Sequence, residues 1–281
     1  MTTTFKQYNT LASTTALVVD ALNLSFRWKH KGQFDFADEF ISTVNSLARS
    51  YKAGKIIIAA DWGSSSYRLN IYDGYKGARK DKFSEQTEAE KAEFELFFEG
   101  FTQTLEKIKS ETNFITLRFN KVEADDIAAF IVNNREQFNL ERIWLISSDR
   151  DWDLLIQDGV SRFSTVSRKE FTVDNWEEHY EWTMDEYISI KCLQGDKGDS
   201  VPGIPGIGPT RALSLVRSYG SALDLANAIP IPGKQKYLQA VNEFGADNIL
   251  RNYQLMDLVT YSEDAIGKDN CETIKRILNA A

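Results

Sequence analysis

Several short apolar segments of this sequence end in carboxylates. The clearest is the run 143–146, which leads through two serines into alternating aspartates. The acids that follow such runs are Asp20, Asp61, Glu123, Asp125, Asp149 and Asp151. Carboxylates held close together repel one another, so a positive group must stabilise them. Oxygen-only ligands suit hard divalent cations, and we therefore expect magnesium at these acids, with manganese able to replace it.

An alternative explanation needs no metal. A single aspartate after a strand can cap the next helix, as Asp149 or Asp153 could do here. Acids in the first turn of a helix also offset its dipole, and this explanation suits Asp126 best. It explains less well why acids follow four successive apolar runs. We include Asp126 among the predicted ligands and leave the helix-dipole alternative open.

Asp196 and Asp199 form a further acidic pair within a glycine-rich segment. They are one helical turn apart, so both side chains can face the same way. Alone they are typical of a turn, but together with the other acids they predict a second metal site. Two hard cations about 4 Å apart can hydrolyse a phosphodiester, because one generates hydroxide and the other stabilises the leaving oxygen.

A parallel sheet is the element best able to bring these acids together. The predicted strands are 16–20, 55–61, 115–119 and 143–146, with 162–166 at the edge, and apolar residues at helical spacing cover 36–53 and 94–109. Strand, helix and strand in this order form right-handed units, in which helices cover a parallel sheet. Ligands of such α/β sheets bind beyond the carboxyl ends of the strands, where the acids lie.

The pattern changes along the rest of the chain. Residues 62–92 lack an apolar face, which is typical of a functional or disordered segment. Beyond about residue 184 the pattern is helical, with short helices expected over 211–227, 233–244 and 246–258. We therefore predict an α/β core at 1–183 and a helical region at 184–281.

The glycine-rich turn before the helix at 211 has residues suited to phosphate. Gly206 and Gly208 let the backbone approach a phosphate closely, and the amides at the helix start can donate to it. Arg211 adds a positive charge. The alternative is an ordinary turn between two helices.

A basic run at 75–82 lies between two of the acid-bearing segments. Lys76 and Arg79 could neutralise a scissile phosphate there, and Tyr75 could stack on a splayed base. Arg27 belongs to a second basic cluster just past Asp20. The alternative is a solvated helix face, which charge runs usually are.

Composition narrows the choice of function. The 281 residues carry a net charge of −8, which argues against a phosphate-binding partner unless acids and bases are separated along the chain. The sequence has two histidines, which argues against a histidine-based zinc site or a Ser–His–Asp triad. Cys192 and Cys271 have no metal-site spacing. With no apolar run long enough to span a bilayer and no signal-peptide pattern, we expect a cytoplasmic protein without a membrane partner.

The motifs taken together resemble a known family. They are Val19-Asp20-Ala21-Leu22-Asn23, Tyr75-Lys76-Gly77-Ala78-Arg79, Val122-Glu123-Ala124-Asp125-Asp126, Ser148-Asp149-Arg150-Asp151-Trp152-Asp153, Gly195-Asp196-Lys197-Gly198-Asp199 and Gly206-Ile207-Gly208. Their order resembles that of the phage-type 5′-nucleases, which are flap endonucleases with 5′→3′ exonuclease activity. The 5′-nuclease domain of bacterial DNA polymerase I is related to them. The resemblance covers about residues 16–260.

The resemblance implies a PIN-like (Rossmann-like) core, a helical arch at about 67–95, and a helix–three-turn–helix element that grips duplex DNA. It implies a first metal cluster of Asp20, Asp61, Glu123 and Asp125, and a second of Asp149, Asp151, Asp196 and Asp199. By the same similarity Lys76 and Arg79 are basic residues of the arch, Tyr75 is their aromatic neighbour, and Arg27 and Lys191 lie near the site. Asp20, Asp125, Asp149, Lys76 and Arg79 are the predicted catalytic residues. Potassium is expected at the loop that follows Asp199. Arg150 departs from the family pattern, because many relatives have a small residue between these two acids.

The resemblance also implies an activity, namely hydrolysis of DNA near single/double-strand junctions by two magnesium ions. The expected substrate is DNA with a 5′ flap or a 5′ single-stranded end, with an RNA–DNA hybrid as a variant. We expect a monomer that acts in phage DNA replication and repair, in the host cytoplasm. A PIN-type ribonuclease and a catalytically silent DNA-binding protein of the same fold are the alternatives.

Overall fold

The computed structural model describes residues 12–280, which form two compact units. The first unit consists of the described residues up to Ser64, of Gln86–Val173 and of the residues from Ser262 onward. The second consists of Ser65–Glu85 and Asp174–Tyr261. The predicted division at residue 183 differs from this arrangement in two places. Ser65–Glu85 belongs to the second unit with the later helices, and the segment from Ser262 onward belongs to the first unit.

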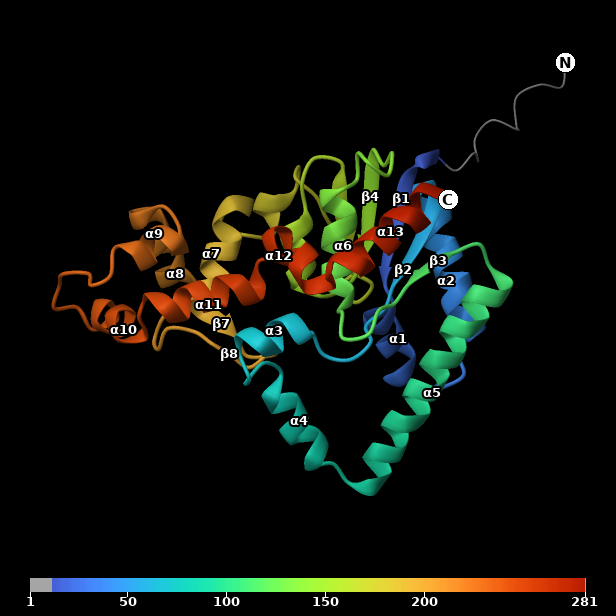
Figure 1. Cartoon of the computed structure of the whole chain (residues 1–281), viewed down its shortest axis with the longest axis horizontal. Helices are drawn as coiled ribbons and strands as arrows, with labels where there is room; N and C mark the ends of the chain where they lie inside the picture. Colours follow the sequence, from blue (N-terminus) through green and yellow to red (C-terminus); the bar gives the residue numbers. More distant parts are fainter. Residues whose placement is uncertain (1–11, 281) are drawn as a thin grey trace, which may run out of the picture. The chain divides into compact units, whose positions relative to one another are not determined.

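A six-stranded sheet forms the centre of the first unit, in the order β3-β2-β1-β4-β5-β6 (Figure 1). The strands are β1 (Ala12–Asp20), β2 (Ala53–Ala59), β3 (Ile115–Leu117), β4 (Arg142–Ile146), β5 (Val160–Phe163) and β6 (Glu170–Phe171). The first five are parallel and β6 is antiparallel to β5, which confirms the mostly parallel sheet.

The edge of the sheet differs from the prediction of a last strand at 162–166. The strand β5 begins at Val160 and ends at Phe163. The backbone N–H of Ser164 donates to the carbonyl of Lys169 at 3.0 Å, and Arg168 has a φ of 59°. This turn folds the chain back, so that β6 and not β5 is the edge strand.

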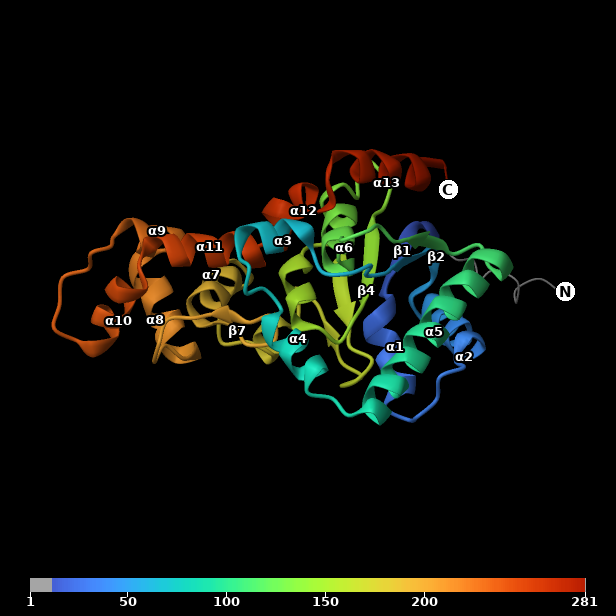
Figure 2. The same ribbon diagram turned by 60° about the horizontal axis from the view of Figure 1, so that its bottom comes forward.

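Helices cover both faces of the sheet. The helices of the first unit are α1 (Ala21–Lys29), α2 (Ala37–Tyr51), α5 (Glu88–Glu111), α6 (Ala124–Asn133), the 3₁₀ helix η1 (Arg150–Leu155) and α13 (Lys268–Ala280), with α12 (Leu258–Ile266) shared between the units. The helices α2 and α5 bury Phe40, Phe97 and Phe101 against Leu17 and Val19 of β1. Figure 2 shows α6 and α13 on the other side of the strands. This three-layer order is typical of α/β domains with a parallel sheet.

The second unit is helical, as the sequence predicts beyond residue 184. Its elements are α3 (Ser66–Ile71), α4 (Gly77–Ser84), η2 (Trp176–Glu178), α7 (Met184–Gln194), β7 (Gly195–Asp196), β8 (Val201–Pro202), α8 (Pro209–Tyr219), α9 (Ala222–Asn227), α10 (Lys236–Phe244) and α11 (Ala246–Met256). The expected helix 211–227 is two helices, because Gly220 interrupts it with a φ of 108°. Arg68 of α3 donates to the carbonyl of Leu255 at 2.9 Å, which ties the segment after residue 64 to α11.

None of the helices between residues 12 and 280 combines the length and the apolar composition needed to cross a bilayer.

Candidate active site

Asp20 lies at the carboxyl end of β1, where the strand order changes direction. Its neighbour on one side is β2 and on the other β4, so this is the switch point at which ligands of open α/β sheets bind. Asp20 is buried, and its Oδ1 accepts a hydrogen bond from the N–H of Asn23 at 3.0 Å. Its Oδ2 accepts from the hydroxyl of Ser147, beyond β4, at 2.8 Å. Asp20 therefore caps α1 and also joins two strand ends.

The acids of the first unit interact electrostatically. Burial of Asp20 and the nearby charge of Asp61 raise the pKa of Asp20 from 3.8 to about 8, with a smaller contribution from Asp149. Hydrogen bonds from Asn23 and Ser147 oppose this rise in pKa without cancelling it. A cation among the three carboxylates would relieve both the burial cost and the repulsion. The carboxylate donor set fits a hard divalent ion.

Asp61 lies two residues beyond the end of β2 and is partly buried. Its Oδ1 accepts a hydrogen bond from the N–H of Ala124 at 3.0 Å, at the start of α6. Glu123 occupies the N-cap position of that helix, yet its buried side chain makes no capping hydrogen bond. The carboxylate that binds the first N–H of α6 thus comes from a different strand.

Asp125 and Asp126 both lie in the first turn of α6. The indole N–H of Trp152 in η1 donates to Oδ1 of Asp125 at 2.5 Å. Trp152 is fully buried, so it holds this carboxylate from inside the core. Asp126 is buried, with 1% of its surface exposed, in accordance with a role within the helix.

Asp149 and Asp153 differ sharply in their surroundings. Asp149 is exposed and caps η1, since its Oδ1 accepts from the N–H of Asp151 at 3.0 Å. Asp153 is buried and forms a two-point ion pair with Arg162 of β5. Arg162 also donates to the carbonyl of Ser147 at 2.9 Å. Asp153 is therefore neither a cap nor an open ligand, but part of the support beneath the loop that carries Asp149.

Sequence reasoning missed four residues that position the acids: Asn23, Ser147, Trp152 and Arg162. Besides its contact with Asp20, Asn23 accepts a hydrogen bond from the N–H of Ser148 at 2.9 Å, which joins α1 to the end of β4. Two of the four lie within motifs that were noticed for their acids. Arg162 gave a usable signal, because an arginine within a buried strand requires a buried acid.

The carboxylates are mostly engaged by the chain itself. Within residues 12–280, no three aspartate, glutamate, histidine or cysteine side chains converge closely enough to hold a metal ion as they stand. Asp20, Asp61 and Asp125 each accept a hydrogen bond from a hydroxyl, a backbone amide or an indole N–H.

Asp196 and Asp199 lie in the second unit, where the structure brings them together with predicted basic residues. Asp199 accepts hydrogen bonds from Arg79 at 2.7 Å and from the hydroxyl of Tyr75 at 2.9 Å. The ammonium of Lys76 is 4.0 Å from Oδ1 of Asp199. These three residues of the arch segment thus meet one acid of the predicted second metal cluster.

Asp196 has a cation of its own. Its Oδ2 is 3.6 Å from the ammonium of Lys191, and its Oδ1 accepts from the N–H groups of Gly198 and Asp199 at 2.7 and 3.1 Å. The turn interpretation is therefore correct for Asp196, and it coexists with the contact to Lys191.

Tyr75 does not offer the stacking surface expected from the sequence. Only 2% of the residue is exposed, and its ring packs in the apolar core of the second unit. The expectation was wrong because the residues next to Tyr75 are polar, whereas the core that buries it comes from helices more than a hundred residues later. Arg27, the other predicted basic residue of the rim, is exposed near the end of α1.

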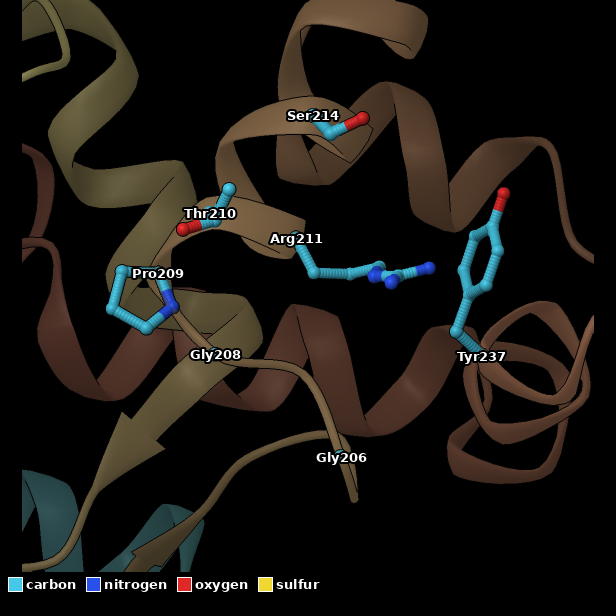
Figure 3. Close-up of a pocket in the computed structure, with 7 residues that line it drawn as sticks. All are labelled: Gly206, Gly208, Pro209, Thr210, Arg211, Ser214 and Tyr237. Atoms are coloured by element: carbon cyan, nitrogen blue, oxygen red, sulfur yellow. The ribbon is translucent and has the colours of Figure 1, made fainter.

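The glycine-rich turn before α8 borders an open pocket of about 540 Å³, with Arg211 and Tyr237 on its wall (Figure 3). Gly206 has a φ of 74°, which favours glycine, and a Cβ at Gly206 or Gly208 would meet nothing within 4 Å. The backbone is thus open to an approaching ligand. The guanidinium of Arg211 points toward the ring of Tyr237, 4.3 Å from its centroid. Such a contact leaves the N–H donors of Arg211 available.

Comparison with known proteins agrees with this geometry. The family model of the 5′-3′ exonuclease N-terminal resolvase-like domain matches residues 15–181. The flap endonuclease of Escherichia phage T5 is 42% identical over 252 residues, which are 89% of this chain and 85% of that protein. DNA polymerase I of Bacillus caldotenax is 25% identical over 237 residues, which are 82% of this chain and 24% of the polymerase.

A crystal structure of the bacteriophage T5 flap endonuclease, a pseudo-enzyme–product complex with DNA and metal ions, has a TM-score of 0.88 to this chain. The two are 39% identical, and the match covers 94% of this chain and 97% of that one. The resemblance read from the motifs and the PIN-like fold class are thereby confirmed. The chain belongs to the 5′-3′ exonuclease family of nucleases, together with the phage T5 flap endonuclease.

Proposed function

We propose that this protein is a magnesium-dependent, structure-specific 5′-nuclease that hydrolyses DNA near single/double-strand junctions. One observation carries the proposal. Asp20 lies at the switch point of the sheet, where its burial, then the charge of Asp61 and, least, that of Asp149 raise its pKa to about 8. A chain that concentrates negative charge in this way has a strong electrostatic reason to bind a cation there. The metal ions and DNA bound in the phage T5 relative support the same assignment.

We assign the ligands of the two metal ions as the family resemblance implies. The first ion would be held by Asp20, Asp61, Glu123 and Asp125, and the second by Asp149, Asp151, Asp196 and Asp199. When bound, the two ions supply an activated water and stabilise the leaving oxygen. Magnesium is the proposed ion, with manganese as a substitute. Asp126, buried in the first turn of α6, remains a candidate ligand, with the helix-dipole role as the alternative.

The basic residues near Asp196 and Asp199 would act on the phosphate. Lys76 and Arg79 would neutralise the scissile group, together with Lys191, which pairs with Asp196 in the same unit. All three form ion pairs with acids in this structure, so each must exchange a carboxylate for a phosphate oxygen when DNA binds. Both partners are anions, so the exchange keeps each cation charge-paired.

The turn at Gly206 and Gly208 would bind the duplex. Its open backbone and the available guanidinium of Arg211 suit a phosphate of the duplex backbone. Such contacts do not distinguish one base sequence from another, so the substrate would be selected by the shape of the junction. A potassium ion at the loop after Asp199 is part of the proposal. We further propose a monomer that acts in phage DNA replication and repair, in the host cytoplasm.

Substitution of the acids tests the assignment. Asp149→Asn and Asp151→Asn should abolish magnesium-dependent cleavage of a flap duplex while leaving its equilibrium binding in EDTA within about two-fold of wild type. Arg150→Gln is the matched control, because it lies between the two acids and is expected to retain cleavage. Normal cutting by both Asn variants would refute the metal assignment. Comparable cleavage of an RNA flap would favour the ribonuclease alternative.

A further inference from the structure

Trp62 directly follows Asp61 and is unusually exposed. About half of the residue, 51%, is open to solvent, whereas the other five tryptophans are buried or half-buried. A single exposed apolar residue has no meaning by itself. The exposure of Trp62 is informative because the residue lies next to a predicted metal ligand and because its backbone is held by hydrogen bonds.

The chain holds Trp62 in place from both sides. Its N–H donates to the carbonyl of Val122 at 3.3 Å, and its carbonyl accepts from the N–H of Lys121 at 2.7 Å. The guanidinium of Arg118 lies 5.2 Å from the centroid of its ring, and Arg118 also donates to the carbonyl of Asp61 at 3.2 Å. The backbone of Trp62 is thus fixed between Asp61 and the segment that leads into Glu123.

We infer that Trp62 is a stacking platform for an unpaired base of the DNA strand that is cleaved. An exposed aromatic ring beside basic side chains is how proteins bind single-stranded nucleic acid without reading its sequence. Arg118 supplies positive charge next to this ring. Tyr75, the aromatic residue first expected to stack, is buried and cannot do so. The inference rests on the proposed function, because it requires an unpaired nucleotide beside the acids.

Coupling between the ring and one base is the direct test. Dissociation constants of wild type, Trp62→Ala and Trp62→Phe are measured by fluorescence anisotropy in calcium and in EDTA. The probe is a 5′-flap duplex, used intact and with a single abasic site at each position around the junction. Trp62→Ala should bind the intact flap about ten-fold more weakly, within the range for loss of one base–aromatic stack. Trp62→Phe should retain most of the affinity.

The abasic series identifies the partner of the ring. At one position near the junction, loss of the base should weaken wild type about ten-fold and Trp62→Ala hardly at all. Phe98→Ala, which removes an exposed aromatic from α5, should show no such coupling. As a readout independent of affinity, flap binding should quench wild-type tryptophan emission, and Trp62→Phe should lose most of that quenching.

Two results must be kept apart. If wild type binds and cleaves the flap but no position couples to Trp62, the stacking inference is overturned and the proposed function stands. If wild type neither binds nor cleaves the flap, the proposed function fails and the inference fails with it.

Discussion

The guanidinium of Arg79 lies 2.7 Å from Oδ1 of Asp199, so a predicted phosphate-binding cation pairs with a predicted metal ligand. Lys76 lies near the same oxygen, and Lys191 pairs with Asp196. The carboxylates of the second unit therefore have cations of the chain itself as partners, whereas Asp20 in the first unit is crowded by other acids. A metal ion at Asp199 must compete with Arg79, and a phosphate that takes Arg79 must favour the metal.

This competition predicts opposite effects of one substitution. Arg79→Gln should bind magnesium or manganese about two- to five-fold more tightly in the absence of DNA, as expected for loss of a partly exposed ion pair. The same variant should cleave DNA more slowly at saturating metal, because it lacks a cation that binds the scissile phosphate. Isothermal titration calorimetry measures the first effect and single-turnover kinetics the second. Lys82→Gln, which removes an exposed charge from the same helix, is the control for metal binding. Weaker metal binding by Arg79→Gln would contradict the exchange.

The contact between Trp152 and Asp125 predicts that an indole N–H supports the metal site. Trp152→Phe keeps the buried ring but removes the donor, so Asp125 loses its alignment. We expect a higher magnesium concentration at half-maximal cleavage and a loss of about 1–3 kcal/mol in the free energy of unfolding. Trp176→Phe is the matched control. It removes a buried indole donor of the second unit, where the N–H of Trp176 donates to the carbonyl of Trp182. An unchanged magnesium requirement for Trp152→Phe would show that Asp125 is held by other contacts.

The raised pKa of Asp20 predicts how the metal-free protein responds to pH. Between pH 4 and 8 the folded form keeps the Asp20 proton, while the unfolded chain, with a pKa near 3.8, loses it. The folded state then binds more protons than the unfolded state, so the free energy of unfolding falls as pH rises through this window. Asp20→Asn should flatten that fall and exceed wild type in stability at pH 8 in EDTA. Urea unfolding at pH 5.5 and pH 8 measures the difference. Added magnesium should stabilise wild type more than the variant, and equal pH slopes for the two proteins would count against the crowded acid cluster.

The buried pair of Asp153 and Arg162 supports the loop that carries Asp149. Arg162→Met leaves the carboxylate of Asp153 buried without its counter-ion, and we expect a loss of about 3–5 kcal/mol in the free energy of unfolding. The double variant Arg162→Met/Asp153→Leu should recover most of that loss, because no buried charge remains. Chemical denaturation tests both. If the double variant is as unstable as the single one, the packing of Arg162 and not its charge determines the stability of this loop.

The strand ends were predictable because each has a strong local signal, an apolar run followed by an acid. The sequence could not show which acid contacts which element. Asp61 caps α6 from the end of β2, and Asp153 of η1 pairs with Arg162 of β5, and both contacts depend on the fold. The prediction that Tyr75 stacks on a base was wrong for a related reason, since the core that buries this residue is distant in sequence. Basic residues were predicted to bind phosphate, but their pairing with Asp196 and Asp199 depends on the folded second unit.

The most direct test of the account uses a duplex with a 5′ flap, labelled at its 5′ end and incubated with and without magnesium. The account predicts that magnesium releases the labelled flap as an oligonucleotide cut near the junction, and that EDTA prevents the release. Binding without cleavage in both magnesium and manganese would contradict it. That result would identify a DNA-binding protein with the fold of a nuclease, with Arg150 between Asp149 and Asp151 as the first residue to replace.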